Sequence, residues 1–461
     1  MSSRQGPVVH KFGGSVLADA AAFRRVSTIV HSEQQSGAFQ HGALLVISAC
    51  AGVTDRLLAI AQAAAAGKAE QAEQELQALE QQHLGLVTEL GLDRGELQEY
   101  VRRLCAELAE LCRGIAYLGE LTLRTRDAVL GYGELLASAI VAELLRRELP
   151  VPVHLVDARR VLLTDYHFGN ATPMIGESGY LLQKEGVTGA LQRGEVVVTQ
   201  GFIGATPSGI PTTLGRGGSD YSAAAFARAL EARELQLWKD VPGICTADPR
   251  RFPEAQPVAE ISYAELQELA RFGSKVVHPH AISPAVSGEI PVRIRSVFAP
   301  QQPGTLVWHR RYDAPAQPLA LAWRERCMAF RWYPKGNSPL AEMPEIVDTV
   351  RKVLELYVVA ASQGSVLLVT GPSTGTLEEL YGKVSFLPHQ FVLACIVGNE
   401  PSRWTWEALE LLRNSDAVSA VWTGVSPVAL YVLLEESAAQ SALAELHGWI
   451  LHTHALQRLR L

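Results

Sequence analysis

The chain has 461 residues, of which 48% are hydrophobic and 19% charged, and its formal net charge is −7. This length predicts two or three domains with ample core, and the acidic balance argues against a nucleic-acid partner, which needs a basic face. Six scattered cysteines without a CxxC pair indicate neither a zinc site nor a disulfide framework; with no secretory signal and no run of 18 apolar residues, we expect a cytoplasmic protein that spans no membrane.

The first part of the chain is expected to alternate strands and helices. Val8–Phe12 is a short apolar strand, Ala20–Val30 a helix and Ala43–Ser48 a second, continuously apolar strand. This order and spacing predict a parallel βαβ unit whose sheet is covered on both faces. Residues 57–111 are then strongly helical, and their Ala-, Gln- and Glu-rich stretch predicts a solvated helical hairpin.

Further strands and helices are expected before residue 300. The predicted strands are Val151–Val156, Glu195–Thr199, Leu235–Trp238 and, as the last of them, Pro291–Phe298. The predicted helices at the end of this part are Glu260–Phe272 and His278–Val286. The Pro- and Gly-rich stretch Ala299–Thr305 then indicates a domain boundary.

Beyond this boundary the order of elements changes. We expect strand, helix, strand, strand, helix and a final short strand at Phe391–Val397, Trp404–Leu412, Val418–Trp422, Val428–Leu434, Ser437–His447 and Trp449–His452. This is the βαββαβ plan of ferredoxin-like units, and residues 328–382 repeat it more weakly. The predicted architecture is therefore α/β. Residues 1–305 form a mainly parallel sheet sandwiched by helices, and residues 306–461 form ferredoxin-like α+β units.

Several segments place polar residues or glycines at predicted strand ends and turns, where ligands of parallel sheets collect. Lys11 lies at the end of the first strand, one residue before a Gly13-Gly14 turn that suits an anion. No GxxxxGK[ST] motif occurs, so this is not a Walker A loop. Comparable segments carry Ser48 and Thr54, Glu134, Asp240 and Arg250, and Lys275.

Residues 212–230 carry a glycine-rich loop followed by a predicted helix at Tyr221–Leu230. Ser219 or Asp220 is expected to cap this helix. Gly215, Gly217 and Gly218 let the backbone turn sharply, and the helix start favours an anion. Taken alone, the segment fits an ordinary capped helix equally well.

Together and in this order, seven motifs resemble those of aspartate kinases, of the amino-acid kinase superfamily. They are KFGGS, SACAGVTD, GELLASA, TQGFIG, TTLGRGGSDYSA, DVPGICTADPR and FGSKVVHP. The match covers roughly residues 8–305, and residues 306–461 loosely resemble the tandem ACT regulatory region of that family. The resemblance implies transfer of the γ-phosphoryl group of ATP, with Mg²⁺, to the side-chain carboxylate of L-aspartate, in biosynthesis of lysine, threonine and methionine.

The resemblance also implies a role for each matching residue. The catalytic set is Lys11, Asp220 and Lys275. The aspartate-binding set, in which Glu134 faces the amino group and Arg216 the α-carboxylate, is Ser48, Thr54, Glu134, Phe202, Arg216 and Ser219. The nucleotide-binding set is Gly13, Gly14, Ser15, Gly217, Gly218, Lys239, Asp240, Cys245, Arg250 and Lys275. Lys239 stands where the family usually has Thr or Ser and Cys245 where Tyr is common; no residue is assigned to a metal.

The chemistry fits these residue types. A carboxylate acceptor is ionised at neutral pH, with a reference pKa of ~3.9, so no general base is required. Phosphoryl transfer instead needs cations around the developing charge, which Lys11, Lys275 and Mg²⁺ can supply. Arginine at 216 can pair with a carboxylate through two hydrogen bonds, which lysine cannot.

Other readings of the sequence stay open. One is a different kinase of the superfamily, acting on glutamate or acetylglutamate. Another is a catalytically inactive amino-acid sensor. Evidence against the sensor is that the chain retains Lys11, Glu134, Arg216 and Asp220. The motifs also resemble the kinase part of bifunctional aspartokinase–homoserine dehydrogenases, although no GxGxxG fingerprint occurs. We expect a homodimer or higher homo-oligomer assembled at least partly through residues 306–461. Pro339 and Pro344 in the expected effector segment favour a weak response to lysine or threonine.

Overall fold

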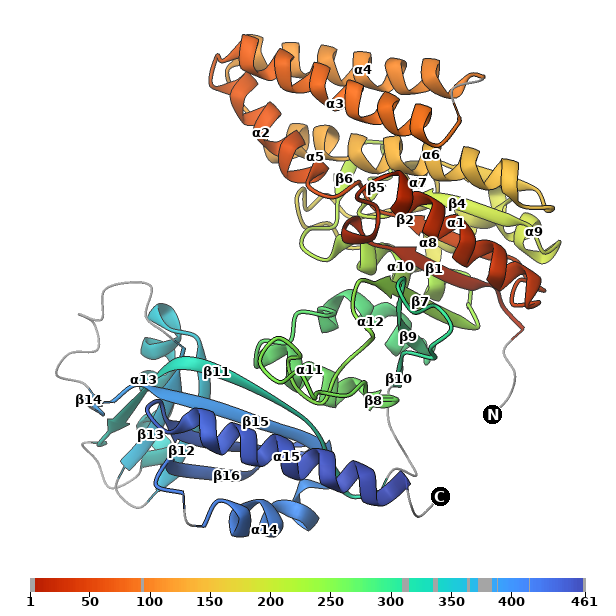
Figure 1. Ribbon diagram of the computed structural model, residues 1–461. Coiled ribbons are helices and arrows are strands. Elements are labelled where there is room, and N and C mark those ends of the chain that lie inside the picture. The colour runs from red at the N-terminus through yellow and green to blue at the C-terminus, as the bar shows by residue number, and fades with distance from the viewer. Residues whose placement is uncertain are drawn as a thin grey trace. The chain divides into compact units, whose positions relative to one another are not determined.

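The computed structural model describes residues 5–92, 95–308, 315–334, 339–362, 365–371, 384–387, 389–413 and 415–458. The chain forms two compact units (Figure 1). Unit one comprises Met1–Ile244, Ala259–Tyr263 and Val276–Arg310, and unit two comprises Cys245–Val258, Ala264–Lys275 and Arg311–Leu461.

Unit one is built on an eight-stranded sheet with the order β3-β4-β2-β1-β7-β9-β10-β8. The neighbours from β3 to β9 pair in parallel, whereas β10 runs antiparallel to β9 and parallel to β8. Every residue of β1, β2 and β4 is buried, as predicted for parallel strands covered on both faces. The strands are β1 (Val8–Phe12), β2 (Ala43–Ile47), β3 (Val153–Val156), β4 (Val196–Gln200), β7 (Glu234–Lys239), β8 (Glu260–Ser262), β9 (Val292–Ser296) and β10 (Thr305–Trp308).

Two groups of helices cover this sheet. One group has α6 (Tyr132–Glu148) against β2, β3 and β4, with α1 (Ala20–Gln35) packed on α6. The other has α10 (Gly218–Ala229) against β1, β2 and β7, with α8 (Ile175–Lys184) and α12 (Pro279–Ser287) packed on α10. Shorter elements complete the unit: η1 (Gly14–Val16), α5 (Leu123–Leu130), α7 (Ala158–Val161), α9 (Val187–Gln192) and the hairpin β5 (Ile203–Ala205)–β6 (Pro211–Thr213).

The predicted helical hairpin is present but is less solvated than expected. α3 (Ala69–Glu89) and α4 (Leu97–Leu118) pack on each other and both contact α2 (Val53–Ala65) (Figure 1). Along α4 the buried residues recur at helical spacing, at Val101, Leu104, Cys105, Leu108, Cys112 and Ile115. This spacing gives α4 an apolar stripe that a solvated helix would lack.

The run Leu123–Glu148, which covers α5 and α6, is long and apolar enough to cross a membrane, with a mean hydropathy of 1.6 in its most apolar window. In that window, however, 83% is buried inside the protein. A helix that is apolar on all sides can lie in a core or in a membrane. Its contacts with three strands of the sheet identify α6 as a core helix of unit one.

Two predictions near residue 300 were wrong in detail. Glu260–Ser262 forms strand β8 rather than the start of a helix, and α11 (Tyr263–Arg271) begins only after it. Strand β9 is not the last strand of the sheet, because β10 follows the Pro- and Gly-rich stretch and pairs with both β9 and β8. That stretch is therefore a turn within unit one, and the predicted boundary at residue 305 falls at the first residue of β10.

Unit two is built on a seven-stranded antiparallel sheet with the order β12-β13-β11-β15-β17-β16, and β14 also pairs with β11. The strand β11 (Gln317–Trp332) belongs to both halves: its first part pairs with β15 and its last part, from Met328, pairs with β13. One core gathers around Phe330 and Val350, and a second around Ile396 and Leu446. The remaining elements are β12 (Leu356–Ser362), β13 (Ser365–Thr370), β14 (Ser385–Phe386), β15 (Phe391–Asn399), β16 (Val418–Ser426), β17 (Ala429–Glu435), α13 (Pro339–Val353), α14 (Pro401–Leu411) and α15 (Ala439–Arg458).

The strand predicted at Trp449–His452 does not form, because this stretch continues α15. Leu443, Leu446 and Ile450 are buried in the second core at spacings of three and four residues, which extends the helical stripe through the predicted strand. Strand β15 instead pairs with the first part of β11 and with β17. In the weaker repeat, the predicted strand, helix, strand, strand order is present as β11, α13, β12 and β13, and residues 372–382 lie outside the described residues.

Candidate functional site

The polar side chains of the site come from the carboxyl ends of three neighbouring strands. β1 pairs with β2 on one side and with β7 on the other, both in parallel. Lys11 of β1 is in register with Leu237 of β7, so Lys239 lies two residues further along. Side chains alternate along a strand, so Lys11 and Lys239 face the same side of the sheet. Helix α10 covers that side, because its Asp220 contacts both lysines.

Asp220 is held between two lysines. Lys11 Nζ is 2.7 Å from Asp220 Oδ1 and Lys239 Nζ is 2.7 Å from Asp220 Oδ2. Lys11 and Asp220 are buried, with 6% and 8% of their side chains exposed, and Lys239 is partly buried, with 14% exposed. Burial on its own would raise the pKa of Asp220, but the two ammonium charges hold that pKa below its usual range. Burial lowers the pKa of Lys11, which Asp220 opposes and Lys239 reinforces. The cluster therefore presents a net positive charge at the strand ends.

The predicted cap of the α10 helix was wrong. The helix begins at Gly218, and Gly217, with φ of 74°, occupies the cap position without a side-chain hydrogen bond. Ser219 and Asp220 thus lie in the first turn. Ser219 Oγ is 3.0 Å from Ser48 Oγ, while both carboxylate oxygens of Asp220 face lysines. The sequence shows a capping residue type, but only the fold shows that cations take its oxygens.

Two glycines make the close approach of this turn possible. A Cβ on Gly218 would lie 2.7 Å from the Phe202 ring, and a Cβ on Gly201 would lie 2.8 Å from Ser219 Cβ. Phe202 itself adopts φ of 66°, a conformation that costs free energy outside glycine. Its backbone N–H donates to Ser222 Oγ at 3.0 Å, which ties the end of β4 to the start of α10.

Glu134 lies in the first turn of α6, as predicted, and is 1% exposed. Its Oε1 accepts a hydrogen bond from the Ala49 N–H at 3.2 Å, and its Oε2 has no partner among the described residues. Burial raises the pKa of Glu134 to about 8, against the opposing effects of the Ala49 N–H and of Lys11. A buried carboxyl with a spare oxygen beside Ser48 suits an incoming ammonium group, which would favour its charged form.

Glu134→Gln is expected to change the pH dependence of stability. Because the folded-state pKa is raised, the folded protein holds this proton more tightly than the unfolded chain. Stability is therefore lost as pH rises from the unfolded pKa of ~4.3 toward 8. Glutamine removes the effect, so the variant should gain on the order of 3 kcal/mol relative to wild type between pH 5 and 8.5, measured by urea unfolding. Glu70→Gln, at an exposed position of α3, is the matched control, and a pH-independent difference for Glu134→Gln would contradict the assignment.

The loop that carries Arg216 is anchored by a residue that the sequence did not single out. Buried Asp127 of α5 accepts hydrogen bonds from Thr213 N–H at 2.9 Å, Thr213 Oγ1 at 2.8 Å and Gly169 N–H at 2.7 Å. Burial raises the pKa of Asp127, and these donors oppose that rise. Arg216 is exposed between β6 and α10, where its guanidinium is accessible to a ligand. The sequence did contain a signal for this residue, because Asp127 is an acid in the apolar half of the short helix α5. This signal was missed.

The remaining predicted residues of unit one lie near these elements. Gly13 and Gly14 are tightly placed, since added Cβ atoms would meet Lys11 Nζ at 3.2 Å and Ala49 O at 3.1 Å. Thr54 is half-buried in the first turn of α2. Ser15 and Asp240 are exposed.

Three predicted nucleotide-side residues belong to unit two. Cys245 forms an isolated bridge with Pro257, and Lys275 is exposed. Arg250 pairs with Asp248 at 2.7 Å. Their roles stay predictions.

The described residues offer little to hold a metal by themselves. Among the described residues there is no group of three His, Cys, Asp or Glu side chains that could hold a metal. Both carboxylate oxygens of Asp220 already form ion pairs with lysines. Mg²⁺ commonly keeps one or two carboxylates plus substrate phosphates as ligands. Mg²⁺ would therefore arrive with, and be held chiefly by, nucleotide phosphates, where it would neutralise phosphoryl oxygens.

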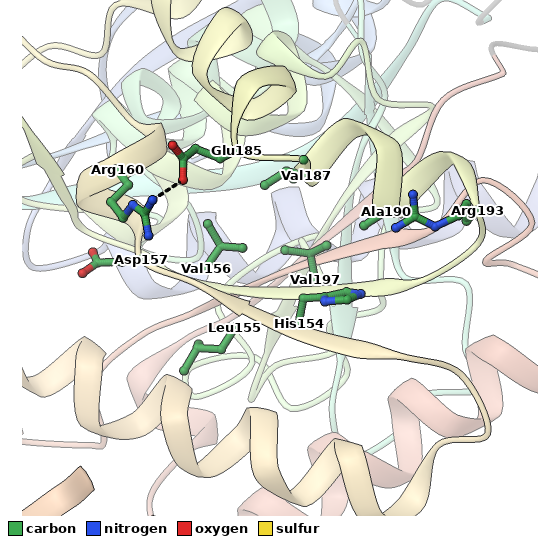
Figure 2. Close-up of a pocket in the computed structure, with 11 residues that line it drawn as sticks. His154, Leu155, Val156, Asp157, Arg160, Glu185, Val187, Ala190, Arg193 and Val197 are labelled. Carbon is green, nitrogen blue, oxygen red and sulfur yellow. Dashed lines mark ion pairs between the residues drawn. The ribbon is translucent and has the colours of Figure 1, made fainter.

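A separate cavity of about 300 Å³ lies beside β3 and β4 (Figure 2). None of the predicted site residues lines it. Its charged residues pair among themselves or with neighbours: Arg160 with Glu185 at 2.6 Å, and Arg193 and His154 with Glu195 at 2.7 and 2.8 Å. The cavity is therefore distinct from the strand-end cluster.

The chain resembles known proteins in both sequence and fold. The model of the amino acid kinase family matches residues 6–296. The chain is 37% identical to lysine-sensitive aspartokinase 3 of Escherichia coli (strain K12), over 67% of this chain and 65% of that protein. Two solved structures of E. coli aspartokinase III each align over 96% of this chain and 99% of theirs at 30% identity. The complex with lysine and aspartate (T-state) has a TM-score of 0.79, and the complex with aspartate and ADP (R-state) has one of 0.73.

Proposed function

The chain belongs to the amino acid kinase family, and on that premise we propose that it is an aspartate kinase. It transfers the γ-phosphoryl group of ATP to the side-chain carboxylate of L-aspartate and releases 4-phospho-L-aspartate and ADP. The observation that carries this proposal is the buried Lys11–Asp220–Lys239 cluster with Glu134 nearby, in a chain similar along its length to an enzyme that binds aspartate and ADP.

Each residue of the site has a task in this reaction. Glu134 receives the ammonium of aspartate and Arg216 its α-carboxylate, which leaves the side-chain carboxylate to attack the γ-phosphorus. Ser48 and Ser219, 3.0 Å apart, can donate to substrate oxygens between these groups and the lysines. Lys11 neutralises phosphoryl oxygens as charge develops, and Asp220 positions its ammonium. Gly217 and Gly218 bring the start of α10 close to the anion.

A coupled assay of ADP release tests the function. Aspartate should support turnover far better than glutamate or N-acetylglutamate, and hydroxylamine should trap the acyl phosphate product. Turnover with glutamate instead of aspartate would replace the proposal by another kinase of the family. ATP binding without turnover on any acceptor would favour an inactive sensor.

Arg216→Lys keeps the positive charge but loses the two parallel N–H donors that pair with a carboxylate. We expect the KM for aspartate to rise by about 10-fold or more while the KM for ATP changes little, measured by steady-state kinetics with each substrate varied. Arg113→Lys, at an exposed position of α4, is the control. If the KM for ATP rose instead, Arg216 would belong to the nucleotide side.

Unit two supports a proposal about assembly and regulation. Its sheet ends in the strands β12 and β16, and strand edges of this kind commonly pair with another chain. We expect a homodimer by light scattering, formed through residues 306–461. Pro344 lies within α13, which begins at Pro339, and no Gly-Phe step occurs there, so inhibition by lysine or threonine should be weak. A monomer in light scattering would contradict the proposed assembly. Strong inhibition by lysine or threonine at sub-millimolar concentration would contradict the proposed weak regulation.

The proposed setting follows from the reaction. A cytoplasmic enzyme that phosphorylates aspartate would serve biosynthesis of lysine, threonine and methionine. Lys275, Cys245 and Arg250 are proposed to contact the nucleotide, and Mg²⁺ to accompany ATP.

A further inference from the structure

Lys239 is the residue of the site that departs most clearly from the family pattern, in which Thr or Ser is usual. In the structure it is the last residue of β7 and it shares the carboxylate of Asp220 with Lys11. Its backbone is fixed, because Lys239 O accepts a hydrogen bond from the Val297 N–H at 2.9 Å. The preceding Trp238 is fully buried and donates from its indole N–H to His10 Nδ1 at 3.1 Å. The backbone of Lys239 is therefore anchored at the end of β7.

The charges around Lys239 do not balance within the protein. One buried ammonium group, of Lys11, and one partly buried group, of Lys239, face one carboxylate, and removing a charge from water without a counter-charge is costly. Within the part of the chain that the structure describes, Asp220 is the one acceptor that each ammonium meets. A lysine ammonium has three N–H donors, so each keeps donors for anionic oxygens. The surplus positive charge lies on the side of the sheet where Lys11 borders the Gly13 turn.

We infer that Lys239 is a second phosphate-binding cation, which pairs with Lys11 across Asp220 to hold the terminal phosphates of ATP. The inference rests on the proposed kinase function. Asp220 keeps the two ammonium groups apart and aimed at the same anion. A Thr or Ser at this position could donate one neutral hydrogen bond, whereas Lys239 adds a full charge, and charge-assisted hydrogen bonds are roughly twice as strong.

A purely structural role for Lys239 predicts different behaviour. If it only neutralised Asp220, its loss would leave Asp220 paired with Lys11, a balanced buried ion pair. Nucleotide affinity would then be unchanged, or would fall equally for every nucleotide. A phosphate contact predicts instead a loss that depends on the presence of the terminal phosphates.

The experiment titrates the full-length protein with AMP and with a non-hydrolysable ATP analogue by calorimetry. For Lys239→Met we expect the Kd of the analogue to rise about 10- to 100-fold, and that of AMP to change less than three-fold. Lys239→Arg should restore part of the analogue affinity, and Lys239→Thr should resemble Lys239→Met. Lys184→Met, at an exposed position at the end of α8, is the matched control and should leave both affinities unchanged.

Circular dichroism and urea unfolding establish that each variant is folded. If Lys239→Met does not fold, Lys239→Thr takes its place in the titrations. Analogue affinity within three-fold of wild type, or an equal loss for AMP, would overturn the inference. The titration also separates it from the proposed function. A wild type that phosphorylates no aspartate refutes the function, whereas the difference between analogue and AMP still decides the role of Lys239.

Discussion

Lys11→Ala is expected to lower kcat for aspartate phosphorylation by on the order of 10²-fold or more. The ammonium is buried, fixed by Asp220 at 2.7 Å and placed beside the Gly13 turn, so it needs no reorganisation when charge develops on the phosphoryl group. Alanine removes that charge and leaves space that water would fill. The dipole of a water molecule stabilises an anion less than a full positive charge does. The measurement is single-turnover kinetics, which reports the chemical step apart from product release.

The fold should survive this substitution. Asp220 would still pair with Lys239, so no buried carboxylate is left without a cation. Lys184→Ala on the surface of α8 is the control and should keep normal turnover. A folded Lys11→Ala variant with near-normal kcat would remove Lys11 from the catalytic set.

Asp220→Asn is expected to destabilise unit one by roughly 3–5 kcal/mol, because it leaves two buried ammonium groups without their counter-charge. Urea unfolding at several pH values tests the cause. The pKa of Asp220 is lowered in the folded state, so its contribution is present above the unfolded pKa of ~3.9 and is lost as pH falls through the folded pKa. The difference between wild type and variant should therefore be large at pH 7 and shrink in strong acid.

A matched acid on the surface separates this effect from a general loss of charge. Asp55→Asn, at an exposed position in the first turn of α2, should cost less than ~1 kcal/mol. If Asp220→Asn were as stable as wild type at pH 7, the two lysines would not depend on the carboxylate. The positioning role of Asp220 would then be wrong.

The parallel core was predictable from the sequence because its strands are continuously apolar. β1, β2 and β4 were placed within a residue or two, and α10 was recognised from its alanines. Predictions failed where a decision depended on distant residues. Glu260–Ser262 pairs as β8 only because β10 lies beside it. The end of α15 was mistaken for a strand because a short apolar run has no clear period on its own.

The site shows the same division. Lys11, Glu134 and Asp220 could be chosen from motifs and helix starts. The sharing of Asp220 between Lys11 and Lys239 could not, because it depends on the register of β1 against β7, strands far apart in the sequence. Asp127 was missed for a similar reason: its partners, Thr213 at the end of β6 and Gly169 in a turn, are brought to α5 only in the folded chain.

The strand β11 limits which fragments of this protein can fold and constrains how it folds during synthesis. It is 16 residues long and serves both halves of unit two, with its first part pairing with β15 and its last part with β13. During synthesis the whole strand leaves the ribosome well before Phe391–Asn399, so for that interval the first part of β11 has an unpaired edge that invites aggregation or chaperone binding. A nascent chain stopped between the halves would keep that edge permanently, and a fragment beginning after Trp332 would lack the strand altogether. Neither half of unit two can therefore complete its sheet without β11.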